Sequence, residues 1–499
     1  MGLYFTFAQL LTKNTTMSNI KISVAKGDGI GPEIMDAVLN IFNAANVKLD
    51  YEYIDMGKGI YDKGFSTGMT DEAKVSVEGN GILFKGPMET PKGGGVKSIN
   101  VTARKTWSTY ANRRHFQSLP GVDTVFSKAG IPIDITIVRE NIEGTYGGIE
   151  HMNTHDVAIC RRIISRPGSA QVIRFAFEMA RKEGFKKVTC AHKANIMKLT
   201  DGLFLETFQE IAKEYPEINS NDIIVDDLAM KLVARPQEFQ VVVLTNLQGD
   251  IMSDLCAGLV GGLGFAPSAN IGDNISIFEA VHGTAPDITG KLLANPTSLL
   301  LSGLMMLRYI GFVKEAALIE NALRYTLEQG VHTADFGDRA LAPSNTNEFA
   351  EAIIKNLGKQ PEFSKPREAV DGVELFTKTE NKHYQKMMVT PLHTEQKIVG
   401  VDFFVESDLP ASEMAKLIEP KLASSQKLIM ISNRGTMVWP TGSAFTECVD
   451  HYRVRIEGTS SQVEIFALLS AISADMYIPS HEVLRMYGSK PGYSLAQGQ

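Results

Sequence analysis

Residues 225–255 read VDDLAMKLVARPQEFQVVVLTNLQGDIMSDL, and they combine a helical segment, a buried strand and a second helix. The apolar run 241–244 predicts the strand. Asp250 and Asp254 lie four residues apart, so a helix places both carboxylates on one face. Like charges at that spacing repel unless a cation lies between them, and carboxylate oxygens suit Mg²⁺ or Mn²⁺. An isolated pattern of this kind more often marks two solvated acids, so the metal-site hypothesis depends on the other motifs.

The composition predicts a globular protein of several domains. A chain of 499 residues is expected to form two or three of them. The net charge of −7 and the isoelectric point near 5.9 argue against a nucleic-acid partner, which favours a basic face. The four cysteines lack CxxC spacing, which argues against a zinc site or a disulfide framework. The sequence has no apolar run long enough to predict a membrane span.

Residues 1–16 precede a second methionine, Met17, and are expected to be a disordered extension. Gly2 and Thr6 formally match a myristoylation pattern. A transit peptide is less well supported, because this segment has no arginine. We therefore expect a cytoplasmic protein, with the mitochondrial matrix as the alternative.

Strand-like and helical segments alternate, which predicts an α/β fold with a largely parallel sheet. Residues 27–33, GDGIGPE, follow a predicted strand and precede a predicted helix. Their spacing is GxGxG, whereas a Rossmann dinucleotide loop has GxGxxG. We interpret this motif as a structural turn between strand and helix, with a cofactor loop as the alternative.

Polar and basic residues gather between positions 98 and 139. Ser98, Asn100 and Arg104 are expected on one face of a helix, and Arg114 follows shortly after. Arg139 follows a predicted strand, where sites of α/β proteins are found. Each arginine alone is more typical of a surface ion pair, but together they predict a receptor for a small molecule with several carboxylates.

Two further residues are candidates for proton transfer. Tyr146 ends the stretch RENIEGTY, and Lys193 follows the predicted strand 187–190. A lone tyrosine or lysine is usually structural, but a site that shifts the pKa of either group can use it as an acid or base. The later stretch 279–290, rich in glycine and proline, is a candidate loop around a nucleotide.

Six motifs in this order resemble the isocitrate dehydrogenases, which belong to the β-decarboxylating dehydrogenases together with 3-isopropylmalate dehydrogenase. The motifs are GDGIGPE, KGPxxTPxGGGxxSxNVxxRK, RENxEGxYxGIE, HKANIMK, NLQGDxxSD and EAVHGTAPD. The resemblance runs from about residue 20 to residue 356. It implies the two-subdomain fold of that family, which is not a Rossmann fold.

The resemblance implies metal-dependent oxidative decarboxylation of isocitrate to 2-oxoglutarate, a reaction of the tricarboxylic acid cycle. Residues expected to bind the substrate carboxylates are Ser98, Asn100, Arg104, Arg114 and Arg139. Residues expected to hold Mg²⁺ or Mn²⁺ are Asp250 and Asp254, with Asp226 from a second copy of the chain. Residues expected to be catalytic are Tyr146, which would protonate C3, Lys193 from the second copy, which would take the hydroxyl proton, and Lys85.

The resemblance also implies a cofactor loop. The residues expected there are Thr90, Glu279, His282, Gly283, Thr284, Ala285, Asp287, Ile288, Asn295 and Asp335. NADP-using members have Lys-Tyr where this chain has Asp287-Ile288. A phosphate about 4 Å from a carboxylate meets a repulsion of roughly 1 to 4 kcal/mol per charge pair. We therefore expect NAD as the cofactor, with NADP as the alternative if Arg235 of the second copy reaches it.

The domain organisation follows from the same resemblance. A large cofactor-binding subdomain is expected over residues 17–114 and 261–357, and a smaller dimerisation subdomain over 115–260. A short β arm within 147–165 is expected to be exchanged between subunits of a homodimer with composite sites. Isocitrate is the expected small-molecule partner, and neither nucleic acid nor a membrane is expected.

Beyond a predicted linker at 358–395, residues 396–499 predict a small α+β domain. Strands are expected at 398–406, 428–432, 436–439 and 452–457, and helices at 411–422 and 461–474. The segment resembles the extra C-terminal domain of a subset of prokaryotic isocitrate dehydrogenases. We interpret it as an assembly module, through which higher oligomers are possible, with ligand sensing as the alternative.

Three other functions stay open. An isopropylmalate or homoisocitrate dehydrogenase would carry a different residue pattern around Ser98 and Asn100. A non-catalytic regulatory subunit usually loses site residues, whereas this chain keeps them. An NADP-dependent isocitrate dehydrogenase differs only in the cofactor.

Overall fold

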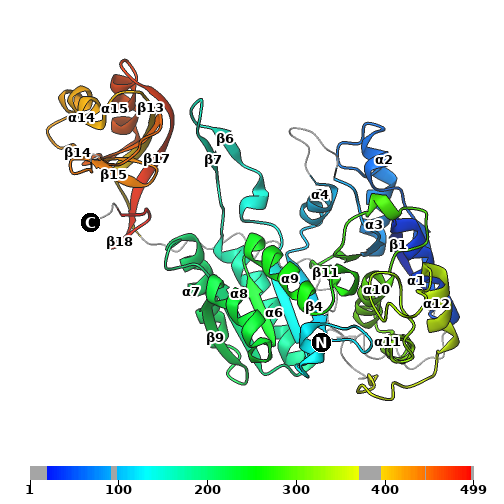
Figure 1. Ribbon diagram of the computed structural model, residues 1–499. Coiled ribbons are helices and arrows are strands. Elements are labelled where there is room, and N and C mark those ends of the chain that lie inside the picture. Colours follow the sequence, from blue (N-terminus) through cyan, green and yellow to red (C-terminus); the bar gives the residue numbers. More distant parts are fainter. Residues whose placement is uncertain (1–18, 91–97, 370–394, 444, 496–499) are drawn as a thin grey trace, which may run out of the picture.

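The central feature of the computed structural model is a ten-stranded sheet (Figure 1). The structure describes residues 19–90, 98–369, 395–443 and 445–495. The strand order is β2-β1-β3-β12-β11-β4-β5-β10-β8-β9. The strands are β1 (Ile20–Ala25), β2 (Leu49–Tyr53), β3 (Ile82–Lys85), β4 (Ala111–Gln117), β5 (Asp134–Glu140), β8 (Lys187–His192), β9 (Asn219–Ile224), β10 (Val241–Leu244), β11 (Pro267–Ile271) and β12 (Ser276–Ala280). The predicted extension 1–16 and most of the predicted linker lie outside the described residues.

The sheet is parallel at both ends and antiparallel in the middle. β11 runs antiparallel to β12 and β4, and β4 runs antiparallel to β5. The remaining pairs of neighbouring strands are parallel. The prediction of a largely parallel sheet therefore misses the central strands, where β4 and β5 place Arg114 and Arg139 on neighbouring strands, with Arg139 opposite Asn112 and Arg114 opposite Ile137.

Two groups of helices cover the two ends of this sheet (Figure 1). The helices at the first end are α1 (Gly31–Ala44), α3 (Asp71–Asn80), α10 (Thr297–Tyr309), α11 (Val313–Glu328) and α12 (Thr346–Lys355). The helices at the second end are α6 (Arg166–Glu183), α7 (Thr200–Ala212), α8 (Val225–Ala234) and α9 (Asn246–Leu259).

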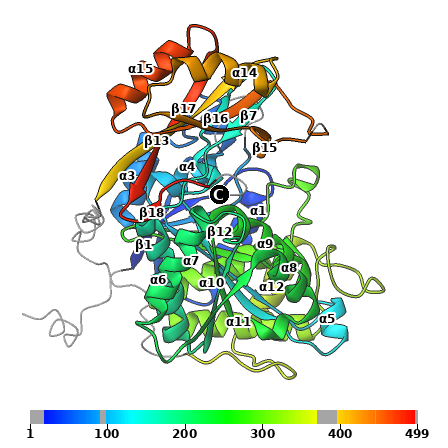
Figure 2. The same ribbon diagram turned by 90° about the vertical axis from the view of Figure 1, so that its left-hand side faces the viewer.

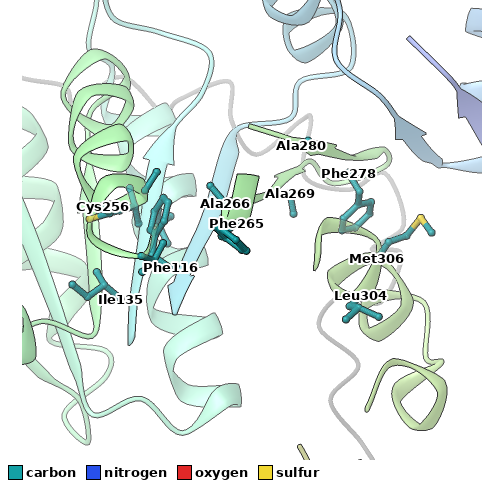
Figure 3. Close-up of a cluster of buried hydrophobic side chains, with 14 of the residues drawn as sticks. Phe116, Ile135, Cys256, Phe265, Ala266, Ala269, Phe278, Ala280, Leu304 and Met306 are labelled. Atoms are coloured by element: carbon teal, nitrogen blue, oxygen red, sulfur yellow. The ribbon is translucent and has the colours of Figure 1, made fainter. Parts of the chain in front are cut away.

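One apolar core runs through both ends and holds them together. Figure 3 shows members of it from β4, α9, β12 and α10, among them Phe116, Cys256, Phe278 and Met306. The helices have local reasons to begin where they do. At α12, for example, the side chain of Asn345 accepts hydrogen bonds from two backbone N–H groups, and the Glu348 carboxylate accepts one from the backbone N–H of Asn345, which completes a capping box.

A two-stranded hairpin projects from the body (Figure 1). It consists of β6 (Glu150–Met152) and β7 (Ala158–Cys160), which are paired antiparallel. Its exchange between subunits stays a prediction, as do the residue boundaries of the two subdomains, because the sheet continues from one to the other.

The C-terminal domain has its own sheet and its own core. Its elements are β13 (Gln396–Glu406), α14 (Ala411–Ile418), β14 (Lys427–Asn433), β15 (Thr436–Trp439), β16 (His451–Glu457), α15 (Gln462–Ile472), β17 (Tyr477–Tyr487) and β18 (Lys490–Pro491). The antiparallel order β14-β16-β13-β17, with α14 and α15 on one face, is a ferredoxin-like arrangement (Figure 2). The predicted α+β class is confirmed, although the sequence reading missed β17.

In the described part of the chain, helices of membrane-spanning length and apolarity are absent.

Candidate active site

The first part of the site is a buried ion-pair cluster at the ends of β3 and β12. Lys85 ends β3, and its Nζ contacts Glu279 of β12 and donates to Oδ1 of Asn100 at 2.8 Å. Arg104 donates from Nη2 to the other oxygen of Glu279 at 2.8 Å. Asn100 and Arg104 lie on α4 (Ile99–Thr106), one turn apart as expected, and Ser98 precedes that helix. Hydroxyl groups of Ser98 and Thr90 lie 3.4 Å apart.

Glu279 holds this cluster together electrostatically. Burial pushes the pKa of the Glu279 carboxyl upward, but Lys85 and Arg104 outweigh burial and hold that pKa far below its usual range. Burial lowers the pKa of Lys85, while Glu279 opposes the shift. Sequence reasoning placed Glu279 only beside the cofactor, and its contact with Arg104 required β12 to lie beside β3.

The second part of the site joins β4, β5 and α9. Arg139 is 1% exposed; its Nε and Nη2 donate to Oδ1 of Asn246 at 3.0 and 2.8 Å, and its Nη1 contacts Asp250. Arg114 lies beside it, with a nitrogen 3.5 Å from each of Asp250 and Asp254. The expected convergence of these arginines on the two acids is therefore present in the fold.

The environment of these groups suits an anionic ligand together with a cation. Burial, reinforced by Arg104 and Arg114, lowers the pKa of Arg139 to about 10. Burial also raises the pKa of Asp254, although Arg114 opposes it. Three guanidinium groups held close to one another gain from a multiply charged anion, whereas two carboxylates on one helix face gain from a cation.

Tyr146 lies against this second part. It belongs to the 3₁₀ turn η2 (Thr145–Gly147), its hydroxyl donates to Asp250, and Arg139 stacks over its ring at 4.9 Å. Burial and the hydrogen bond to Asp250 raise the pKa of Tyr146. The phenol is therefore protonated at neutral pH and is able to donate a proton.

Lys193 and Asp226 form a separate pair. Nζ of Lys193 contacts Asp226 at the start of α8, and the two side chains are 27% and 67% exposed. Among the described residues of one chain, a set of three acids or other ligands able to hold a metal is absent. One chain thus brings together Asp250 and Asp254 but leaves Asp226 and Lys193 elsewhere.

The predicted cofactor loop follows β12. Ala285 has a left-handed backbone with φ of 42°, and the 3₁₀ turn η5 (Pro286–Ile288) begins directly after it. Burial lowers the pKa of His282, whose Nε2 is buried without a hydrogen-bond partner in the described part of the chain. That neutral imidazole is available to a ligand. Gly283, which is exposed, and Thr284, which is half-buried, connect His282 to Ala285.

Asp335 and Asn295 lie together behind this loop. Nδ2 of Asn295 donates to Oδ2 of Asp335 at 3.1 Å, and the hydroxyl of Thr333 donates to Oδ1 at 2.5 Å. Because both oxygens of Asp335 have protein partners, this acid stabilises the loop rather than presenting a free charge.

Sequence reasoning missed some supporting residues. Asn246 anchors Arg139 and donates to the backbone oxygen of Glu143 at 3.1 Å, and Ser253 accepts from Arg114 at 2.6 Å. Both lie in the NLQGDxxSD motif, Asn246 one turn before Asp250 and Ser253 directly before Asp254, which was the available signal. Asn270 of β11 donates to Glu279 at 2.7 Å, and only strand pairing brings it there.

Family models, curated relatives and solved structures all match this chain to one family. Residues 21–353 match the isocitrate/isopropylmalate dehydrogenase family, and residues 396–499 match the bacterial isocitrate dehydrogenase C-terminal domain. An isocitrate dehydrogenase [NADP] of Thermus thermophilus is 46% identical over 486 residues, which cover 96% of each chain. An isocitrate dehydrogenase [NADP] of Rickettsia bellii is 41% identical over 96% of this chain and 99% of that one. A crystal structure of the TT0538 protein from Thermus thermophilus superposes with a TM-score of 0.88 at 45% identity, covering 96% of each chain.

The expectation of an NAD-dependent enzyme is wrong, because relatives that match almost the whole chain are named as NADP enzymes. Asp287 excludes a 2′-phosphate less strongly than its charge alone suggests. The structure shows Asp287 exposed on η5, where water reduces its repulsion of a phosphate to about 1 kcal/mol. Lys291 lies four residues further along the chain, and its Nζ donates to the backbone oxygen of Asp287 at 2.8 Å, so a cation is also present.

Proposed function

The chain belongs to the isocitrate/isopropylmalate dehydrogenase family, and on that basis we propose that it oxidises and decarboxylates isocitrate to 2-oxoglutarate with NADP as the hydride acceptor. The observation that carries the proposal is the convergence of Arg104, Arg114 and Arg139 beside Asp250 and Asp254. This arrangement matches a substrate with three carboxylates and a chelating hydroxyl.

The arginines bind and orient the substrate. Their planar guanidinium groups recognise carboxylates through paired hydrogen bonds, and the protein anchors Arg139 through Asn246 so that little freedom is lost on binding. Ser98 and Asn100 provide polar contacts at the N-terminus of α4. Polar side chains there support isocitrate over substrates with an apolar substituent.

The residues present fit a divalent cation, since Asp250 and Asp254 supply hard oxygen donors on one helix face. Bound Mg²⁺ or Mn²⁺ would supply Lewis acidity toward the substrate hydroxyl and the ketone derived from it. Tyr146, protonated and aimed at Asp250, would donate its proton to C3 after CO₂ departs. Lys193 of a second copy would take the hydroxyl proton. Asp226 beside it would join Asp250 and Asp254 as a third ligand of the cation.

The residues of the cofactor loop fit a dinucleotide. The orphaned Nε2 of His282 is a polar atom that a nucleotide would satisfy, and Ala285 bends the loop around that position. Lys85 and Thr90 would lie at the nicotinamide end, and Lys291 would face the 2′-phosphate side.

Steady-state kinetics with isocitrate and isopropylmalate, each with NADP and NAD in the presence of Mn²⁺, tests this proposal. We expect the highest kcat/KM for the pair isocitrate and NADP. A higher kcat/KM with isopropylmalate would overturn the substrate, and a higher value with NAD would overturn the cofactor. Absence of turnover by the purified chain would favour a regulatory subunit.

A further inference from the structure

The turn between β1 and α1, residues 26–30, contacts both loops that the proposed function assigns to the cofactor. The backbone N–H of Asp28 donates to the carbonyl oxygen of Pro87 at 2.8 Å, in the loop that continues from Lys85. The backbone N–H of Ile30 donates to the carbonyl oxygen of Thr284 at 3.0 Å, in the loop after β12. The GDGIGPE motif, interpreted above as a plain structural turn, therefore connects two segments that are distant in sequence.

The glycines of the motif make this close approach possible. Gly27 and Gly29 have φ values of 81° and 59°, a region that L side chains rarely adopt. A Cβ at Gly27 would lie 2.3 Å from the carbonyl oxygen of Pro87, and a Cβ at Gly29 would lie 2.1 Å from that of Thr284. The backbone of the turn is thus packed directly against both loops.

The side chain of Asp28 ties a third segment to the same place. Its Oδ2 accepts hydrogen bonds from the backbone N–H of Glu89 at 2.8 Å and of Lys58 at 3.0 Å. Lys58 begins the short helix α2 (Lys58–Tyr61), and Glu89 directly precedes Thr90. Gly57 leaves room for the carboxylate, because a Cβ there would lie 2.6 Å from Oδ1. Hydrogen bonds to an ionised acceptor are stronger than neutral ones, so this carboxylate is an effective clamp.

Asp28 also acts on the charge balance of Lys85. Burial is the largest influence on Lys85 and lowers its pKa, and Arg104 adds to that shift. Glu279 and, more weakly, Asp28 oppose it and favour the charged ammonium. The groups that face Lys85 from β12, α4 and the turn are therefore Glu279, Arg104 with Asn100, and Asp28.

We infer that Asp28 is a positioning residue of the active site: its carboxylate holds Glu89 of the Lys85–Thr90 loop, and Lys58, to the turn between β1 and α1, and the backbone of that turn also contacts the loop of Thr284. This inference rests on the proposed function. Asp28 does not need to touch the substrate or the cofactor; it acts through the backbone of Glu89.

Three variants test the inference. Asp28→Ala removes the acceptor, and Asp28→Asn keeps an oxygen that accepts the same backbone hydrogen bonds without the charge. Glu328→Ala is the matched control, since the Glu328 carboxylate likewise accepts backbone N–H groups, those of Glu362 and Ser364 at 2.6 and 2.8 Å, in a segment with no proposed role in catalysis. For each folded variant we would measure KM for NADP, KM for isocitrate, kcat and amide hydrogen exchange.

We expect Asp28→Ala to raise KM for NADP about tenfold to a hundredfold, the scale expected when binding groups are displaced by about an ångström. KM for isocitrate should change much less, because Arg114 and Arg139 are held independently. Amide exchange at Glu89 and Lys58 should become faster in Asp28→Ala and should be intermediate in Asp28→Asn, which keeps an acceptor oxygen but loses the charge. Glu328→Ala should alter exchange only around residues 362–364 and leave both KM values unchanged.

The outcomes separate the two proposals. Unchanged exchange at Glu89 in Asp28→Ala, or an unchanged KM for NADP with faster exchange, overturns the positioning role while leaving the proposed function intact. Exchange in Asp28→Asn that is as fast as in Asp28→Ala also overturns it. Wild-type protein that does not reduce NADP with isocitrate overturns the proposed function, and the inference falls with it.

Discussion

Two groups of paired charges carry the proposed chemistry, and they differ in how far one chain completes them. In the first group, Arg139 is buried and contacts Asp250, which also accepts a hydrogen bond from Tyr146. In the second, Lys193 contacts Asp226 on the exposed start of α8. The comparison indicates that the chain locks one half of the site in its own interior and presents the other half at its surface, where a second copy is expected to use it.

The largest expected effect is on the acids of the two groups. Asp250→Asn should lower kcat about a thousandfold, because a preorganised charge next to the reacting centre is lost. Asp226→Asn should cause a comparable loss, although Asp226 does not join Asp250 and Asp254 in a metal-binding group within the described part of one chain. Steady-state assays with isocitrate, NADP and Mn²⁺ check this.

Asp227→Asn is the matched control for Asp226→Asn. Asp227 lies next to Asp226 on α8, but its carboxylate accepts from Lys231 at 2.7 Å and has no proposed role. We expect near wild-type turnover. Wild-type turnover in Asp250→Asn would contradict the metal assignment, and in Asp226→Asn it would contradict the composite site.

Mixed dimers test directly whether the two groups come from different chains. Tyr146→Phe and Lys193→Ala should each be nearly inactive alone. When both variants are co-expressed, half of the dimers should be hybrids in which one site carries both changes and the other is intact, so about one quarter of wild-type activity should return. If Tyr146 and Lys193 act within the same chain, every site of a hybrid carries one change and activity stays absent.

The two groups should also differ in what they contribute to stability. Arg139→Ala leaves Asn246 and Asp250 without the guanidinium group that they contact. It should lower the free energy of unfolding by about 3 kcal/mol. Lys193→Ala removes an exposed pair, which water screens, and should leave Tm almost unchanged. Denaturant titration of both variants measures this difference, and equal losses would contradict the proposed division into a buried and an exposed half.

The last expected effect is confined to a change in pH and concerns Glu140, which follows Arg139 at the end of β5. Burial raises the pKa of Glu140 to about 7, although backbone N–H groups of Ile142 and Glu143 oppose that shift. The folded state therefore holds a proton that the unfolded state releases at lower pH. Stability should fall as pH rises from about 4.5 to 7, by up to about 3 kcal/mol.

Glu140→Gln removes this titration while keeping an acceptor oxygen for the turn that leads to Tyr146. The variant should show a flatter dependence of unfolding free energy on pH, with its largest gain over wild type above pH 7. Identical pH dependence in the two proteins would contradict the raised pKa.

Local patterns were enough to predict much of the fold and to single out candidate site residues. The apolar run 241–244 is β10 without change, and the DxxxD spacing puts Asp250 and Asp254 on one face of α9. The C-terminal α+β class followed from alternating segments. β17 was missed because its residues are half-buried on both faces, so the sequence shows little alternation there.

The sequence by itself determined the motifs, the family and the candidate charged side chains of the site, because these depend on residue type and on spacing within one helix or turn. Tertiary structure alone decided which of them meet. Glu279 joins Lys85 to Arg104 because β12 pairs with β3, and Asp28 reaches Glu89 because a glycine turn allows backbone contact. Such contacts join residues tens to hundreds of positions apart, and no local period in a sequence encodes a distance that only strand pairing and packing create.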